Sequence, residues 1–314
     1  LPSNLEVGDT VIYDPTKGVT DTSKLTYTSQ EGTVQTGGNR YGTQTVTAKA
    51  NQNEWVVLST ANNQIKVMSK EPIGDIVGGE NNKFTLKGGT GWLYAEEELH
   101  KACSVYGHGK GAKKITTTYQ IGNKYTEEVQ TRTLTGSGAR SMTMEDIVKI
   151  MKGEQYSDFT EDEKKGFEKY YMNPITKCPE TYYLTISSTQ ENGLSADKKG
   201  FDSKGYSIIK TDQYEKELVT DPKVKESKEK LKGHIFKDNQ YWLAVRSVFT
   251  RSYAMFFHIG GARSNWLSVS GSGTFVMING QSAETIANEF LRPVVYLDGS
   301  MIEKVSAGQW KIKD

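Results

Sequence analysis

The chain has 314 residues, of which 35% are hydrophobic and 25% are charged, and its 39 basic and 38 acidic side chains leave a net charge of +1. A nearly neutral chain lacks the basic field with which proteins bind nucleic acid or anionic membranes, so neither is an expected partner. The polar excess, with 31 glycines, is typical of extracytoplasmic β-rich proteins. No apolar run approaches the ~20 residues of a membrane-spanning helix. Because the chain starts with Leu-Pro-Ser, we expect a trimmed fragment whose targeting segment or anchor is missing.

The first third of the sequence predicts strands. Residues Leu5 to Tyr13 alternate apolar and polar side chains, and then Asp14-Pro15 signals a turn. Glu54 to Thr60 and Gln64 to Ser69 predict two firmer strands, joined as a hairpin through Ala61-Asn62-Asn63. The Thr- and Gly-rich segment 14–42 has no helical period and indicates a long loop or short edge strands.

The middle of the chain predicts two main helices. The first carries Leu93, Leu99, Ala102, Cys103 and Tyr106 on one stripe and stops at Gly107. The second, from Ser141 to Gly153, has Ser141 or Thr143 as N-cap and acidic residues in its first turn. Thr160 to Tyr171 predicts a further helix, and Asp212 to Lys232 reads as a polar, lysine-rich insertion.

The last quarter returns to strands and ends in an expected hairpin through Asp298-Gly299. The predicted strands are Gln240 to Val248, Ala254 to Ile259, Trp266 to Val269, Thr274 to Ile278 and Leu291 to Leu297. Strands at both ends with helices between them predict an α+β fold in which the N- and C-terminal strands pair. We expect a single domain over 1–314, with a β-rich part (1–90), a helical middle with an insertion (91–239) and a ligand-display β region (240–314).

Constellations that would carry catalytic or metal chemistry are weak. Glu96, His100 and Cys103 lie at helical spacing, with His108 just beyond, but the core-side positions of Leu99 and Ala102 favour a buried cysteine over a zinc ligand. Whether Cys103 pairs with Cys178 stays open. We therefore predict no metal and no cofactor.

Two glycine-rich loops resemble phosphate-binding loops only superficially. GHGKGAKK, from Gly107, has no strand before it, and TGSGARS, from Thr135, favours a plain capping loop. There is no GxSxG elbow, and the four histidines form no recognisable triad. The chain is therefore predicted not to be an enzyme.

The stretch from Tyr241 to Leu297 has the composition of a recognition surface. No lysine occurs between Lys237 and Lys304, and aromatic side chains are frequent. Rigid rings give contact area at a small entropic cost, so this composition favours binding, although an ordinary β core would use many of the same residues. The candidates from composition are Phe249, Arg251, Tyr253, Phe257, His258, Arg263 and Asn265.

Several blocks of sequence resemble a known group of proteins. They are YWLAVRSV, LRPVVYLDG, VGDTVIYDPT, WVVLST, GWLYAEEELHKACSVYGHGKGA and LTGSGARSMTMEDI. Together they resemble C-type-lectin-like surface proteins of gut Firmicutes and phage, of the formylglycine-generating-enzyme type. This group includes variable proteins of diversity-generating retroelements, often with a pilin-like N-terminal anchor.

The resemblance implies a C-type-lectin-like fold and ligand display without catalysis. By position it implies contacts from the seven residues above and from Trp266, all between two fixed strands. The calcium-binding Glu-Pro-Asn motif is absent, so calcium is not implied.

The predicted function is that of an extracytoplasmic binding or adhesion protein, at a cell surface, secreted or on a phage particle. Its partner would be a protein or glycan on another cell or phage, and it would meet a membrane only through the missing anchor. The alternative is a structural pilus or phage tail subunit that buries the same stretch at a subunit contact. The sequence leaves the oligomeric state open.

Overall fold

A computed structural model describes the fold of most residues before 144 and of much of the chain after 240. The residues it describes are 1–29, 43–61, 63–87, 95–122, 129–143, 146, 230–231, 233–235, 241–251, 254–263, 266–268, 274–277 and 286–314. The predicted helix at Thr160 to Tyr171, most of the insertion at Asp212 to Lys232, and Cys178 lie outside these residues.

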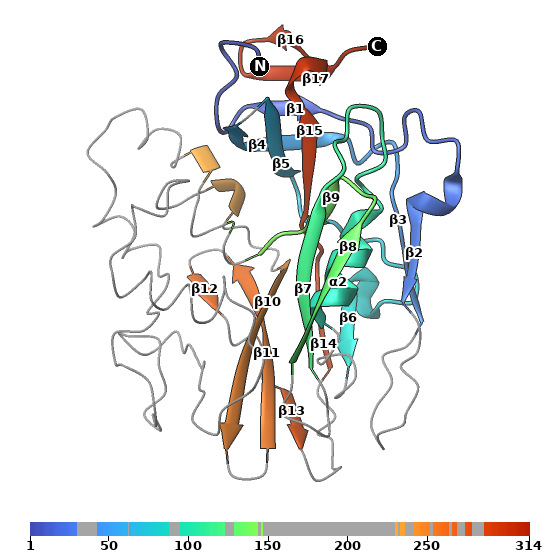
Figure 1. Cartoon of the computed structure of the whole chain (residues 1–314), viewed down its shortest axis with the longest axis vertical. Coiled ribbons are helices and arrows are strands. Elements are labelled where there is room, and N and C mark those ends of the chain that lie inside the picture. Colours follow the sequence, from blue (N-terminus) through green and yellow to red (C-terminus); the bar gives the residue numbers. More distant parts are fainter. Residues whose placement is uncertain are drawn as a thin grey trace, which may run out of the picture.

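A mixed seven-stranded sheet, with the core packed around it, forms the part of the protein that is here called the body (Figure 1). Its strands, in spatial order, are β16 (Ile302–Ser306), β17 (Gln309–Ile312), β1 (Thr10–Ile12), β4 (Glu54–Ala61), β5 (Gln64–Ser69), β15 (Pro293–Asp298) and β9 (Ala139–Ser141). Strands β1 and β17 pair in parallel, and this pairing joins the two ends of the chain. The other pairings in the sheet are antiparallel.

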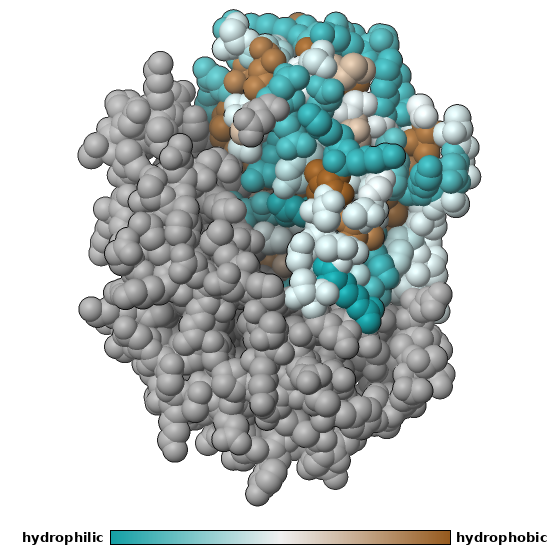
Figure 2. All heavy atoms as spheres, viewed as in Figure 1, coloured by the Kyte–Doolittle hydropathy of each residue, from teal (hydrophilic) through white to brown (hydrophobic). Residues whose placement is uncertain are grey.

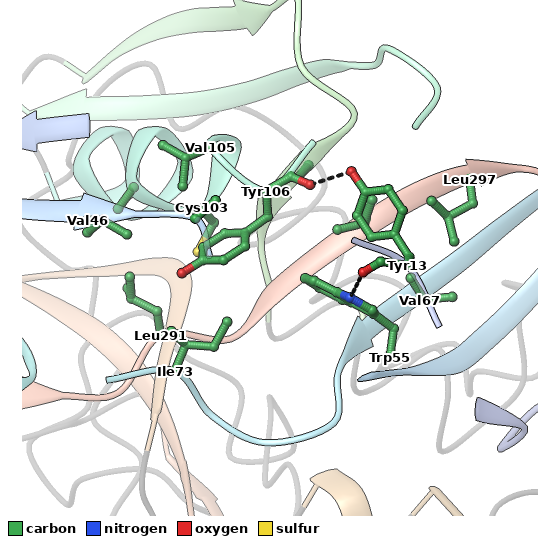
Figure 3. Close-up of a cluster of buried hydrophobic side chains, with 14 of the residues drawn as sticks. Tyr13, Val46, Trp55, Val67, Ile73, Cys103, Val105, Tyr106, Leu291 and Leu297 are labelled. Carbon is green, nitrogen blue, oxygen red and sulfur yellow. Dashed lines mark hydrogen bonds between the residues drawn. The ribbon is translucent and has the colours of Figure 1, made fainter. Parts of the chain in front are cut away.

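The centre of this sheet is buried on both faces. Four consecutive residues of β4, Trp55 to Leu58, are at most 2% exposed, a pattern typical of a strand covered on both sides. The rings of Tyr13 and Tyr106 meet the Trp55 ring edge-on, with centroids 5.7 and 6.1 Å away (Figure 3). The Tyr13 hydroxyl donates to the Tyr106 carbonyl at 2.7 Å, and the Trp55 indole donates to the Tyr13 carbonyl at 2.9 Å. These bonds satisfy polar groups that would otherwise be costly to bury.

Helix α2 (Ala95–Ser104) packs its predicted stripe into the same core. Leu99, Ala102, Cys103 and Tyr106 are fully buried, so the sequence prediction of this helix is confirmed. The acidic first turn is also largely buried. Hydrogen bonds compensate for the burial of two of its carboxylates, because the Tyr27 hydroxyl donates to Glu98 at 2.7 Å and the Tyr119 hydroxyl donates to Glu97 at 3.1 Å. Carboxylates at a helix N-terminus are further stabilised by the helix dipole.

Smaller sheets and short 3₁₀ turns complete the described part. The two-stranded sheets pair β2 (Thr26–Ser29) with β3 (Gln44–Thr47), β6 (Phe84–Lys87) with β14 (Ile286–Glu289), and β7 (Thr116–Gly122) with β8 (Val129–Thr135). A four-stranded sheet contains β10 (Tyr241–Arg251), β11 (Ala254–Arg263), β12 (Trp266–Ser268) and β13 (Thr274–Met277). The 3₁₀ turns are η1 (Thr22–Leu25), η2 (Glu80–Asn82) and η5 (Gly299–Met301).

The predicted α+β class with two main helices is wrong for the described part of the chain, which is dominated by sheet. Thr-rich segments without a helical period, such as 116–122 and 129–135, form strands that pair with each other, and this pairing satisfies their backbone groups. Of the second predicted helix, Ser141 to Gly153, the structure describes only residues 141–143 and 146. There Thr143 Oγ1 accepts from Asp146 N at 3.2 Å and Asp146 Oδ2 accepts from Thr143 N at 2.9 Å. This reciprocal pattern is that of a capping box and agrees with Thr143 as N-cap.

The expected hairpin through Asp298-Gly299 is also wrong. Asp298 caps η5 by accepting from Ser300 N at 2.9 Å, and the next strand, β16, pairs with β17 rather than with β15. Strand β4 and strand β5 do form the predicted hairpin, with Asn63 at positive φ. The first predicted strand is shorter than expected, because only Thr10–Ile12 is paired.

The described residues on the face shown in Figure 2 are mainly hydrophilic. In the view of Figure 2 the described residues are mostly teal or white, and the brown hydrophobic spheres form separate small patches. Among the described helices none is long and apolar enough to cross a membrane.

Candidate functional site

The predicted recognition stretch is fixed to the body at its start. Tyr241, Trp242, Leu243 and Ala244, the first residues of β10, are all buried. The Trp242 indole donates to the Phe84 carbonyl at 2.8 Å, and the Tyr241 hydroxyl donates to the Ile235 carbonyl at 2.9 Å. The first four residues of β10, here called its root, are therefore part of the core.

Tyr241 to Val248 and Leu291 to Leu297, the two fixed strands that the resemblance implies, were expected to pair, but they do not pair with each other. Strand β10 pairs with β11, whereas β15 pairs with β5 and β9. Phe290, just before β15, forms a parallel bridge with Tyr241 and accepts a 2.9 Å hydrogen bond from Trp242 N. Met142 also links the two segments, because its N–H donates to the Arg292 carbonyl and its carbonyl accepts from Ala244 N, both at 2.9 Å. Residues 245–285, here called the display segment, follow the buried start of β10 and precede β14, which pairs with β6. In Figure 1 the β10–β11 pair lies toward the end of the molecule opposite the two termini.

The strand register separates the predicted contact residues into two groups. Opposed pairs are Phe249 with Phe256, Ser247 with His258, Val248 with Phe257, and Arg263 with Trp266. Since opposed positions share a face and successive positions alternate, 249, 251 and 258 fall on one face (face I) and 257, 263 and 266 on the other (face II). Tyr253 and Asn265 lie outside the described residues.

A buried arginine marks the return of the display segment. Arg292 has no exposed surface, and its Nη2 donates to the carbonyls of His234 at 2.8 Å and Lys70 at 3.1 Å. Its guanidinium lies 5.0 Å from the centre of the Tyr241 ring. Within the described part of the chain its Nε and Nη1 have no hydrogen-bond partner. Burial lowers the pKa of this guanidinium, while Tyr241 acts in the opposite direction.

A second arginine, Arg140 on β9, lies in a complete ionic cluster. It donates two hydrogen bonds to Asp146, at 2.6 and 2.7 Å, and one to the Tyr296 hydroxyl at 2.8 Å. Lys66 Nζ is 3.6 Å from the same carboxylate. Burial alone would raise the pKa of Asp146, but the charge and hydrogen bonds of Arg140 outweigh it and hold that pKa well below its usual range.

The residues considered for zinc belong to the core. Cys103 is a free, fully buried thiol whose pKa burial raises to about 12, and burial lowers the pKa of His100 to about 3. Among the described residues no group of three or more His, Cys, Asp or Glu side chains is placed to hold a metal ion.

The two glycine-rich loops pack against each other. Gly138 N donates to the Gly107 carbonyl at 2.9 Å, and a Cβ added at Gly107 would lie 2.2 Å from the backbone nitrogen of Ala139. A Cβ at Gly109 would likewise lie 2.4 Å from the Asp14 carbonyl oxygen. These glycines permit close backbone packing, a sufficient reason for their presence in both loops.

Sequence reasoning missed a cleft of about 610 Å³ in the body. It is lined by Asn51, Gln52, Asn53, Glu54, Ser69, Lys70, Glu71, Pro72, Ile73, Gly74, Asp75, Asn81, Asn82 and Phe290. Two short asparagine-rich turns form much of the rim, and this clustering is the signal that could have indicated it. Phe290 places the cleft beside the root of the display segment.

Comparison of the chain with protein-family models, with curated proteins and with solved structures gives no match. The resemblance to C-type-lectin-like surface proteins therefore stays a prediction from the sequence.

Proposed function

We propose that this chain is a non-catalytic, extracytoplasmic binding protein whose display segment contacts a protein or glycan on another cell or phage surface. The observation that carries the proposal is the fixed root of that segment. Tyr241 and Trp242 are buried and hydrogen-bonded to Ile235 and Phe84, and Phe290 closes the segment beside them. Binding residues are commonly held in this way, on a segment that a rigid scaffold positions.

The composition of the segment fits contact with a ligand. It contains aromatic and arginine side chains and no lysine, the combination that dominates binding energy in protein interfaces. Antiparallel sheets commonly pack one face on a core and leave the other solvated. We therefore expect the ligand to contact either face I or face II, and not both.

Two triple variants test the proposal. One is Phe249→Ala, Arg251→Ala and His258→Ala on face I, and the other is Phe257→Ala, Arg263→Ala and Trp266→Ala on face II. We expect one triple variant to keep the melting temperature within about 3 °C, because truncating exposed residues has little effect on stability. The same variant should lose binding to intact bacterial cells and to a glycan array.

The other triple variant should unfold at a clearly lower temperature. If both variants lose several kcal/mol of stability, both faces are core and the display proposal fails. Self-association that rises with concentration in light scattering, and that the stable variant abolishes, would instead support the pilus or tail subunit.

A further inference from the structure

Among the described residues, four asparagines line the cleft in the body without protein hydrogen-bond partners for their side chains. Within the described part of the chain, the side chains of Asn51, Asn53, Asn81 and Asn82 form no hydrogen bond with another protein group. Each amide carries two donors and an acceptor with two lone pairs. The rim therefore offers both kinds of partner to a ligand.

The wall of the cleft contains a buried hydroxyl without a partner. Ser69 is only 4% exposed, lines the cleft, and its Oγ makes no hydrogen bond among the described residues. Leaving a buried hydroxyl unpaired costs about 1–3 kcal/mol, so folding alone does not favour serine at this position. A ligand hydroxyl that reaches Ser69 Oγ from the cleft would supply the missing bond.

The charged groups at the cleft largely neutralise one another. Lys70 Nζ lies 3.1 Å from Glu54, and Asp75 is 3.4 Å from Lys49, just outside the cleft. Carboxylates outnumber cations in the lining, which disfavours an anionic ligand such as a phosphate. Ile73, Pro72 and Phe290 add an apolar part to the wall.

The backbone at the rim is held in a rarely used conformation. Asp75, Asn81 and Asn82 have φ values of 59°, 53° and 59°, and they are three of the four described non-glycine residues with positive φ. Asparagine and aspartate tolerate this conformation better than other side chains do. Asp75, Asn81 and Asn82 are therefore residue types suited to the backbone conformation at this part of the rim.

We propose that this cleft binds a neutral saccharide of two or three sugar units. Sugar hydroxyls both donate and accept, which matches the amides and the Ser69 hydroxyl, and the apolar wall would contact the C–H faces of the rings. A volume of about 610 Å³ lies within the range of small-molecule sites. The site belongs to the body, so it is independent of the display segment and of the function proposed for it.

The test is saturation-transfer NMR with neutral di- and trisaccharides of glucose, galactose, mannose and N-acetylglucosamine. Each is used at about 10 mM, a concentration at which millimolar binding is detectable. We expect at least one saccharide to bind the wild-type chain. Ser69→Ala should weaken that binding about tenfold or more and leave the melting temperature unchanged or higher, because it removes an unpaired buried hydroxyl.

Two further variants separate recognition from a general effect on the protein. Asn53→Ala, at the rim, should also weaken binding, whereas Asn4→Ala, on an exposed asparagine outside the cleft, should not. The proposal is overturned if no saccharide of the set binds, or if the neutral peptide tri-alanine binds in their place. It is also overturned if Ser69→Ala lowers stability and leaves saccharide affinity unchanged, since serine would then be structural.

Discussion

Arg140 and Arg292 are both largely buried near strand β15, yet their surroundings are opposite. Arg140 donates hydrogen bonds to the Asp146 carboxylate and to the Tyr296 hydroxyl. Its pKa is raised well above the usual value, because Asp146 and Tyr296 outweigh the effect of burial. Arg292 has carbonyls, a sulfur atom and an aromatic ring as neighbours, and burial lowers its pKa.

The difference shows that two buried charges of one kind can have unlike roles. A buried ion pair depends on both partners, because removing either leaves an uncompensated charge. Within the described part of the chain Arg292 donates hydrogen bonds only to neutral groups, and the charge of Glu71 does not outweigh the effect of burial on its pKa. Replacing Arg292 with an apolar side chain of similar length is therefore expected to cost less stability. The Arg140 cluster is therefore expected to matter more for stability than Arg292.

The largest expected effect follows from Arg140→Met, which leaves Asp146 with Lys66 as its charged partner. We expect the free energy of unfolding at pH 7 to fall by about 3–5 kcal/mol in urea titrations. Because the fold lowers the pKa of Asp146, its stabilising contribution is present above the unfolded value of about 3.9 and is lost as pH falls through the folded value.

The difference between Arg140→Met and the wild type should therefore shrink in strong acid. Arg132→Met, on an exposed arginine of β8, is the matched control and should change stability by less than about 0.5 kcal/mol. An equally small effect of Arg140→Met would show that the cluster does not stabilise the fold.

An intermediate effect on the pH dependence of stability is expected for replacement of His100, whose pKa is influenced by Arg140 and Asp146. The pKa of His100 is lowered to about 3, mainly by burial and also by the charge of Arg140, while Asp146 acts in the opposite direction. The unfolded chain therefore binds more protons between pH 6.5 and about 3, and stability falls as pH drops through that range.

His100→Gln should reduce the slope of unfolding free energy against pH by up to about 1.4 kcal/mol per pH unit. Urea titrations between about pH 4.5 and 6.5 isolate this contribution, because Asp146 titrates below that window. His108 also has a lowered pKa, caused mainly by burial, so part of the slope remains. An unchanged slope would mean that the His100 imidazole is protonated in the folded chain.

The smallest effect is expected for Arg292→Met. This change removes the bonds from Nη2 but also removes a desolvated charge, so we expect the free energy of unfolding to change by less than about 1 kcal/mol. The measurement is a urea titration at pH 7, alongside Arg140→Met. A loss above about 3 kcal/mol would show that the charge of Glu71, which acts to raise the pKa of Arg292, compensates the buried guanidinium, and would remove the contrast between the two arginines.

Local patterns in the sequence were sufficient for several elements. The run EWVVLST, the segment QIKVMS and the stripe Leu99, Ala102 and Cys103 each carry a clear period, and each forms the expected strand or helix. The candidate contact residues were chosen by composition, and composition carries no information on which face of a strand a residue occupies. Separating them into face I and face II required the register of β10 with β11.

By itself, the sequence determined the near-neutral charge, the buried β4–β5 hairpin and the core helix, because charge and periodicity are local properties. The sequence also predicted that strands of the two chain ends pair, and β1 with β17 and β5 with β15 confirm it. The tertiary structure alone decided that β10 pairs with β11 rather than with β15, and that Arg292 is buried with its Nε and Nη1 unpaired among the described residues. It also decided that the asparagines of two separate turns surround one cleft. Each of these features depends on residues far apart in the chain, whose distances are set by folding and not by sequence pattern.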